Sequence, residues 1–435
     1  MSKSSELYDR GLKVMPGGCS RNTILRKPHP LYVEKGEGCY VTDIEGVKRV
    51  DFANNMCSLV HGHAYPAITE AVTAQLAKGT AFTIGTESEI LFAEHLVSRS
   101  DSFEKMRFVN SGTEAVMSCL KAARAFTGRS KIAKAEGAYH GLYDYAEVSQ
   151  TSKPGNWGDA DNPKSVPVAY GTPQAALDDV VIIPFNEPER AIKILEENAD
   201  DLACVLLDLM PHRVGLVKAS DEFVRAIEAW VRKNNSLLVF DEVITYRMNY
   251  GGAQEWYLGI KPDLSAMGKM IGGGFPVGAL AGRADVMDVM DPLAEKVLFP
   301  HSGTFSANPI TMTAGRVAME LFDEDAVIKI NKLADYARNS ISEAINLADV
   351  PACVTGGGSM FRIHMKVEAP VSYRDAYVTP RESELTKTLL NHLFDDGIMM
   401  INTCSGVLST VMGEAEIDRL AEAVLGGLKK MKNQF

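Results

Sequence analysis

Short apolar runs alternate with helical patterns through the middle of the chain. Each run is mostly apolar, is bounded by polar or turn-forming residues, and is followed by a helical pattern. A continuous apolar run predicts a strand buried on both faces, as in a parallel sheet covered by helices. We therefore predict a large α/β domain over residues 67–325. The four clearest runs lie at 131–136, 180–185, 203–210 and 236–243.

The two ends of the chain carry a different pattern. Near the N-terminus, apolar and polar residues alternate in two short runs, which predicts a small antiparallel sheet. The C-terminal part begins with a long helical pattern, continues with three short apolar runs and closes with a last helical pattern. We predict that residues 1–66 form the N-terminal segment of a small domain and that residues 326–435 form an α+β C-terminal small domain. The N-terminal runs lie at 31–43 and 47–52, and the C-terminal segments lie at 326–348, 360–367, 397–401, 406–411 and 416–435.

The composition is that of a folded globular protein. The chain has 435 residues, of which 46% are hydrophobic and 23% charged, so it is long enough for two or three packed subdomains. A formal net charge of −11 argues against a surface that binds nucleic acid. The N-terminus lacks the apolar core of a signal peptide, and no stretch approaches the roughly 20 apolar residues that span a bilayer. We therefore expect a cytoplasmic protein without membrane contacts.

The seven cysteines are scattered along the chain. None belongs to a closely spaced pair of the kind that marks zinc or redox sites. We expect free thiols and no metal site. The cysteines are Cys19, Cys39, Cys57, Cys119, Cys204, Cys353 and Cys404.

Lys269 stands at the start of a glycine-rich segment, GKMIGGGFPVG, at 268–278. The lysine follows a strand-like run, and the glycines let the backbone pass close to a ligand. Its amine is a candidate nucleophile. Taken alone, the pattern fits an ordinary solvated lysine equally well, so its partners decide between the two interpretations.

Asp241 ends the apolar run LLVFDEV at 237–243. This position places a carboxylate at the carboxyl edge of a parallel sheet, where such folds bind ligands. A carboxylate there can keep the nitrogen of a pyridine ring protonated, which is what pyridoxal-phosphate chemistry requires of an aspartate. The alternative is an aspartate that caps the next helix.

The segment NSGTEAVMSCLKAARAFTGR at 110–129 predicts a turn of small residues followed at once by a helix. The backbone N–H groups at a helix start, together with the hydroxyls of Ser111 and Thr113, suit a phosphate dianion. A plain capped helix explains the same residues. Two shorter segments, HSGTF at 301–305 and AYHGLY at 138–143, add weaker candidates. In HSGTF, the hydroxyl of Thr304 is a candidate phosphate contact. In AYHGLY at 138–143, Tyr139 offers a flat surface to a ring and His140 a nearby polar group.

Five motifs in a fixed order resemble those of the class III pyridoxal-phosphate aminotransferases. They are SGTEA at 111–115, YHG at 139–141, FDEV at 240–243, GK with its glycine tail at 268–274 and GTFSANP at 303–309. Within that class the chain is most similar to the glutamate-1-semialdehyde aminomutase branch and its transaminase relatives, including those that act on β-amino acids. The similarity runs nearly from end to end.

The resemblance implies an aspartate-aminotransferase-like fold of type I. Its large domain holds a mostly parallel seven-stranded sheet, and a smaller α+β domain accompanies it. The resemblance also implies a pyridoxal 5'-phosphate cofactor and a homodimer with shared active sites, acting on a small-molecule amino donor and an oxo acceptor. Lys269 would form the Schiff base and Asp241 would hold the ring nitrogen. The remaining cofactor contacts implied are Ser111, Gly112 and Thr113 to the phosphate, Tyr139 and Val243 to the two ring faces, His140 nearby, and Thr304 to the phosphate in the neighbouring subunit.

The pocket wall departs from the family pattern. Relatives usually carry a Glu-Pro pair before the aspartate strand, but Asp208 and Leu209 stand here, followed by His212 and Arg213. Arg213 is a candidate for holding a substrate carboxylate, although a surface arginine is the more common case. Arg21 is the stronger candidate because it matches a position where relatives carry an arginine near that carboxylate. A guanidinium group binds a carboxylate as a bidentate fork.

Three functions are compatible with these observations. The leading one is a transaminase that moves an amino group between an amino acid, possibly a β- or ω-amino acid, or an amine and a 2-oxo acid. An intramolecular aminomutase or epimerase is the alternative on the same fold. The segment 402–410 lacks the acidic residue that the aminomutase branch tends to place there, and it also lacks the arginine seen in some transaminases. A non-catalytic pyridoxal-phosphate-binding protein is the third, and the presence of both Lys269 and Asp241 weighs against it.

Overall fold

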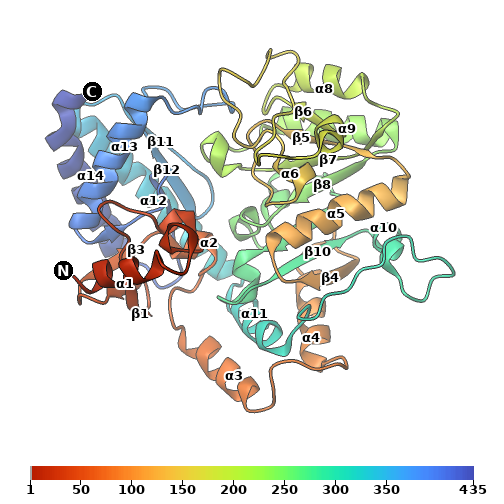
Figure 1. Cartoon of the computed structure of the whole chain (residues 1–435), viewed down its shortest axis with the longest axis horizontal. Coiled ribbons are helices and arrows are strands. Elements are labelled where there is room, and N and C mark those ends of the chain that lie inside the picture. The colour runs from red at the N-terminus through yellow and green to blue at the C-terminus, as the bar shows by residue number, and fades with distance from the viewer. Residues whose placement is uncertain (1) are drawn as a thin grey trace.

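A seven-stranded sheet forms the centre of the molecule (Figure 1). The computed structural model describes residues 2–435. One strand, β10, runs antiparallel to both of its neighbours, and the other six strands run in a common direction. This sheet confirms the predicted mostly parallel α/β architecture. In spatial order the strands are β4 (Lys105–Val109), β10 (Gly278–Gly282), β9 (Leu264–Gly268), β8 (Leu237–Asp241), β7 (Leu202–Asp208), β5 (Lys131–Ala135) and β6 (Val180–Ile183).

The central strands are buried on both faces, and for this reason the sequence shows them as unbroken apolar runs. Every residue of β7 and β8 is buried. On one face, Val205 and Leu207 of β7 share a core with the amphipathic helix α9 (Asp221–Asn234). On the other face, Cys204 and Leu206 share a core with α5 (Gly112–Thr127). Alternate side chains of β7 therefore pack against two separate layers of helices, one on each face of the sheet.

Two smaller sheets join the first and last parts of the chain. The predicted N-terminal antiparallel sheet consists of β1 (Val33–Glu37), β2 (Tyr40–Asp43) and β3 (Lys48–Asp51), and a C-terminal strand, β13 (Ile398–Met399), extends it by pairing in parallel with β3. The other sheet is antiparallel and consists of β11 (Cys353–Thr355), β12 (Met360–His364) and β14 (Ser405–Val407). Figure 1 accordingly shows the red N-terminal elements beside the blue C-terminal ones.

Three long helices build a core around these small sheets. Their apolar faces pack with residues of β3, β12 and β13 in one cluster. The C-terminal strands are present where the apolar runs predict them, but each is shorter than its run. The three helices are α12 (Glu324–Ala348), α13 (Pro380–Asp395) and α14 (Glu414–Met431). The domain boundaries at residues 66/67 and 325/326 remain predictions.

Further helices complete the layers around the large sheet and the N-terminal segment. Among residues 2–435, no helix combines the length and the apolar character that crossing a bilayer requires. All seven cysteines are free thiols. The further helices are α1 (Lys3–Gly11), α3 (Pro66–Leu76), α4 (Glu87–Val97), α6 (Asp144–Glu147), α7 (Gln174–Asp178), α8 (Pro188–Glu196), α10 (Ala284–Met287) and α11 (Pro309–Leu321).

Candidate active site

Lys269 and Asp241 lie at the carboxyl ends of neighbouring parallel strands. β8 ends at Asp241, and β9 ends directly before Lys269. Lys269 has a left-handed backbone with a φ of 49°, which turns the chain out of β9 into a short 3-10 helix, Lys269–Gly272. The structure therefore places both predicted catalytic residues on the edge of the sheet where parallel folds bind ligands.

Asp241 is held in place by a buried histidine. His140 Nδ1 lies 2.7 Å from Asp241 Oδ2, and the backbone N–H of Val243 donates to Asp241 Oδ1 at 3.0 Å. Burial lowers the pKa of His140, although the neighbouring Asp241 opposes that shift. A neutral imidazole donates through one nitrogen only, so the contact with the carboxylate assigns that proton to Nδ1.

Three glycines let the motifs of the large sheet approach one another. A Cβ added at Gly112 would meet Val243 Cγ1 at 2.8 Å, and one added at Gly268 would meet Gly112 Cα at 3.3 Å. A Cβ at Gly141 would meet Thr113 Oγ1 at 2.5 Å. Segments far apart in the sequence thus converge beside Lys269 and Asp241, and any side chain at these glycines would push them apart.

The start of α5 faces this same place. Ser111 is the N-cap of the helix, and its hydroxyl accepts a hydrogen bond from the backbone N–H of Glu114 at 3.1 Å. The capped helix considered as an alternative is therefore present. The cap occupies only one of the N–H groups that a helix start leaves without an intrahelical partner. Ser111, Gly112 and Thr113 remain half-exposed, so the positive end of α5 is open to an anion.

Two further carboxyl groups lie beside Asp241. Asp208 is its register partner on β7, is buried, and accepts from the backbone N–H of Met210 at 2.9 Å. Burial and the neighbouring Asp241 raise the pKa of Asp208 well above its usual value, which favours the protonated form. Burial also raises the pKa of Glu242 to about 7, although two backbone N–H groups donate to its carboxylate. The protein thus surrounds Asp241 with acids that resist ionisation.

Arg213 lies beside Tyr139. The guanidinium carbon of Arg213 is 5.5 Å from the centre of the Tyr139 ring, and His212 packs edge-on against the same ring. Burial lowers the pKa of Arg213, and burial together with the adjacent guanidinium lowers the pKa of His212 to about 3. His212 is therefore neutral across the physiological range. Just after the positions where relatives carry the Glu-Pro pair, this chain therefore places the cation of Arg213 and the neutral imidazole of His212 beside Tyr139.

Arg21 and Thr304 lie on exposed segments. Arg21 is exposed and donates to the side-chain oxygen of Asn55 at 2.8 Å. Thr304 is exposed, although a Cβ added at the adjacent Gly303 would come within 3.7 Å of Asn110, just before the start of α5. A single chain thus brings together Lys269, Asp241, His140 and the α5 start, and it leaves Arg21 and Thr304 at the surface.

A left-handed turn that we did not predict also borders the site. Four consecutive residues of α2 (Asn54–Cys57) have φ between 43° and 73°. Cys57 lies close enough to Lys269 for that cation to oppose the rise that burial causes in the pKa of the thiol. The asparagine pair is the only local signal for this turn, since asparagine tolerates the left-handed conformation better than most residues.

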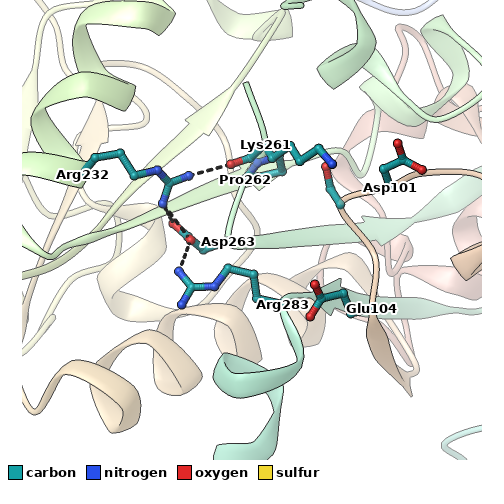
Figure 2. Close-up of a pocket in the computed structure, with 8 residues that line it drawn as sticks. Asp101, Glu104, Arg232, Lys261, Pro262, Asp263 and Arg283 are labelled. Carbon is teal, nitrogen blue, oxygen red and sulfur yellow. Dashed lines mark hydrogen bonds and ion pairs between the residues drawn. The ribbon is translucent and has the colours of Figure 1, made fainter. Parts of the chain in front are cut away.

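A separate cavity lies away from these residues. It measures about 320 Å³ and lies beside Asp263, which precedes β9, whereas Lys269 follows that strand (Figure 2). Asp263 is buried and accepts hydrogen bonds from Arg232 and Arg283 at 2.6 to 2.8 Å. Because both guanidinium groups are already paired there, we assign this charged hollow a structural role.

Comparison with known proteins identifies the family. A model of the class-III aminotransferases matches residues 24–424 of this chain. The chain belongs to the class-III aminotransferases. Enzymes of this family depend on pyridoxal phosphate, which confirms the cofactor and the enzyme class expected from the motifs.

Three similar proteins show how far this class-III aminotransferase resembles its relatives. It is 35% identical to a glutamate-1-semialdehyde 2,1-aminomutase of Methanothermobacter thermautotrophicus, over 98% of this chain and all of that protein. It is 43% identical to the omega-transaminase of Sphaerobacter thermophilus, with a TM-score of 0.96 over 99% of this chain and 98% of that structure. The β-phenylalanine aminotransferase of Variovorax paradoxus is 30% identical, with a TM-score of 0.88 over 99% and 94% of the two chains.

Proposed function

We propose that this class-III aminotransferase moves an amino group from an amino acid, including β- or ω-amino acids, or from an amine to a 2-oxo acid. The observation that carries the proposal is the placement of Lys269 beside Asp241, with His140 holding the carboxylate. The 43% identity with an omega-transaminase and the likeness to a β-phenylalanine aminotransferase support this choice of substrates.

The residues at the strand ends fit pyridoxal phosphate in their chemistry. When bound, this cofactor supplies an electron sink that stabilises negative charge on the substrate carbon. Lys269 would anchor the cofactor through its amine, and the same amine, when free, would serve as the base that moves a proton from the substrate carbon. Asp241 would hold the ring nitrogen and keep it protonated, while His140 keeps Asp241 oriented.

The remaining large-domain candidates divide between the phosphate and the ring. Ser111, Gly112 and Thr113 surround the positive end of α5 and suit the phosphate. Tyr139 and Val243 would lie on the two faces of the ring, and Gly112 leaves the room that Val243 needs. These assignments extend the family membership to individual residues, and substitution at each position tests them.

Arg213 and Arg21 are our candidates for the substrate carboxylate. Arg213 supports this role because it lies beside Tyr139, and its Nε atom is buried without a protein partner among residues 2–435. Arg21 is a candidate because its side chain is exposed. One nitrogen of its guanidinium, Nη1, donates to the amide oxygen of Asn55. Each side chain can present the two parallel donors that a carboxylate accepts.

We further propose a homodimer in which Thr304 reaches the phosphate bound by the partner subunit. The exposure of Thr304 and of the adjacent Phe305, which is 60% exposed, supports a contact with a second copy. A dimer predicts a mass in light scattering of about twice the 47.3 kDa chain, and a single-chain mass would contradict it.

An intramolecular aminomutase is the second candidate, because the curated relative from Methanothermobacter thermautotrophicus carries that name. The two activities differ in stoichiometry. A transaminase consumes one 2-oxo acid for each amino group released, whereas an aminomutase needs no acceptor. Turnover of amino donors with and without pyruvate or 2-oxoglutarate tests the proposal. A strict requirement for the acceptor supports the transaminase, and turnover of glutamate-1-semialdehyde without any acceptor would overturn it.

A further inference from the structure

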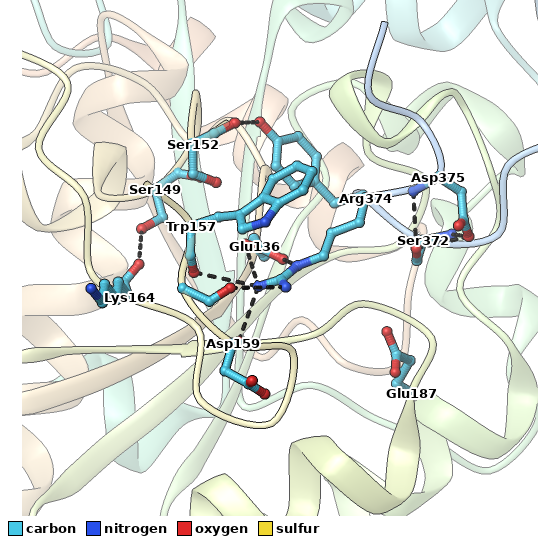
Figure 3. Close-up of polar contacts among 12 residues, drawn as sticks. Glu136, Ser149, Ser152, Trp157, Asp159, Lys164, Glu187, Ser372, Arg374 and Asp375 are labelled. Atoms are coloured by element: carbon cyan, nitrogen blue, oxygen red, sulfur yellow. Dashed lines mark hydrogen bonds and ion pairs between the residues drawn. The ribbon is translucent and has the colours of Figure 1, made fainter. Parts of the chain in front are cut away.

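A segment of the C-terminal part of the chain reaches onto the large sheet next to the candidate site. Residues 370–377 connect β12 to α13 and lie against residues 136–137 and 152–159 (Figure 3). The hydroxyl of Tyr373 donates to the backbone carbonyl of Ser152 at 2.7 Å. The Tyr373 ring also lies where a Cβ of Gly137 would be, so only glycine fits at that position.

Arg374 supplies the strongest contacts of this segment. Its guanidinium donates to both carboxylate oxygens of Glu136, at 2.9 and 3.2 Å. The same group donates to the backbone carbonyls of Trp157, Gly158 and Asp159 at 3.1 to 3.3 Å. We call this set of contacts the Arg374 bridge. The side chain of Arg374 thus joins the C-terminal segment to Glu136 and to residues 157–159, all more than 200 positions earlier.

Glu136 depends on this partner. Its side chain is 2% exposed, whereas that of Arg374 is 22% exposed. Burial raises the pKa of Glu136, and Arg374 opposes the rise. Removing the guanidinium would leave a buried carboxylate without its cation, a situation that costs more than the loss of a surface ion pair.

The bridge acts on the segment that carries Tyr139 and His140. Glu136 and Gly137 directly precede these residues, and the segment is also held by Lys134, whose ammonium donates to the carbonyl of Ala138 at 2.9 Å. Tyr373 also lies near enough to Arg213 for its hydroxyl to oppose the lowering that burial causes in the pKa of that arginine. The 370–377 segment therefore borders both the proposed ring-stacking residue and a candidate carboxylate-binding residue.

We propose that Arg374 is a positioning residue, which fixes Tyr139 and His140 against the cofactor by holding Glu136 to the C-terminal part of the chain. The inference rests on the proposed placement of Tyr139 on the cofactor ring. If Arg374 has this role, the geometry of the cofactor site depends on a contact with the C-terminal part of the chain. A shift of residues 370–377 would then alter the positions of Tyr139 and His140.

The test compares the holoenzymes of Arg374→Gln, Arg374→Lys and the wild type. We measure the circular dichroism of the cofactor's visible band, which reports ring orientation, and the dissociation constant of pyridoxal phosphate from the reconstituted apoenzyme. For Arg374→Gln we expect a changed visible band and a dissociation constant about tenfold higher, as expected when a buried charged hydrogen bond is lost. Arg374→Lys, which keeps the charge but not the fork, should restore part of both.

Arg190→Gln is the matched control. Arg190 forms exposed ion pairs with Asp161 and Glu187 beside the same loop and does not contact Glu136. We expect wild-type values for this variant. If Arg374→Gln lowers the thermal midpoint but leaves the visible band and the dissociation constant within twofold of the wild type, the bridge is structural only and the proposal is wrong. An equal effect of Arg190→Gln also contradicts it.

Two further variants keep the outcome interpretable. If Arg374→Gln does not fold, Tyr373→Phe removes only the hydrogen bond to Ser152 and should give a smaller change of the same kind. Tyr139→Ala separates the two proposals. If it leaves the visible band unchanged, the proposed cofactor site is wrong. If it changes the band while the Arg374 variants do not, only the bridge fails.

Discussion

His140 Nδ1 lies 2.7 Å from Asp241 Oδ2, and both side chains are buried at the carboxyl edge of the central sheet. The two residues are 101 positions apart in the sequence. Because burial lowers the pKa of His140, the histidine acts as a neutral donor that orients the carboxylate. A ring nitrogen approaching Asp241 therefore meets a carboxylate whose direction is already set.

Replacing His140 should weaken cofactor binding. His140→Phe fills a similar volume but leaves Asp241 Oδ2 without its donor, and a lost hydrogen bond to a charged group costs about 1.5–3 kcal/mol. We expect the dissociation constant of pyridoxal phosphate to rise about tenfold to a hundredfold. Equilibrium titration of the apoenzyme measures this, and an unchanged constant would show that the contact does not orient Asp241.

The same substitution should affect kcat strongly at Asp241 and only weakly at the neighbouring Asp208. Asp241→Asn removes the charge that keeps the ring nitrogen protonated, and we expect kcat to fall at least about a hundredfold. Asp208→Asn should keep kcat within about threefold, because burial and Asp241 already favour the protonated, uncharged form of Asp208. Steady-state kinetics on both variants tests the pair. Similar losses in the two variants would contradict the assignment.

Arg213 should affect only donors that carry a carboxylate. We expect Arg213→Gln to raise the KM of amino-acid donors about tenfold, as the loss of a charged hydrogen bond predicts. The KM of amines without a carboxylate should stay unchanged, so these donors serve as the internal control. Arg21→Gln, assayed in parallel, shows which arginine binds the carboxylate. If neither variant distinguishes the two donor classes, both candidates are wrong.

Lys134 should make stability depend on pH. The residue is fully buried, donates to the carbonyls of Ala138 and Val148, and burial lowers its pKa from 10.5 to about 7. Between these values the unfolded chain holds a proton that the folded chain has lost, so this residue favours folding more as pH rises through that window.

Lys134→Met removes this titrating group while keeping an apolar side chain of similar length. The thermal midpoint of the wild type should therefore gain on that of the variant between about pH 7 and pH 9. Measuring both proteins in their apo forms avoids any contribution from the cofactor. A difference in midpoint that does not change with pH would mean that Lys134 stays charged when buried.

Much of the fold could be predicted because burial leaves a direct trace in the sequence. The apolar run at 203–210 marks β7, whose residues are all buried. Lys269 and Asp241 could be found because each follows or ends such a run, and parallel topology brings strand ends to one edge. The class-III resemblance then ordered the separate motifs, and the family comparison confirms it.

The contacts between distant segments could not be predicted. β13 has only two residues and pairs with β3, about 350 positions earlier, so its short apolar run indicates no partner. The Arg374 bridge joins residues 238 positions apart, and its carbonyl partners leave no side-chain pattern. The homodimer and the cytoplasmic location stay predictions from the sequence.

The most direct test of the central claim is the visible absorption spectrum of the purified protein and of Lys269→Ala. The wild type should show a cofactor band that borohydride abolishes and that an amino donor converts to the amine form of the cofactor. Lys269→Ala should lack the covalently bound species. If the wild type shows no such band even with added pyridoxal phosphate, or if Lys269→Ala retains it, Lys269 is not the residue that holds the cofactor.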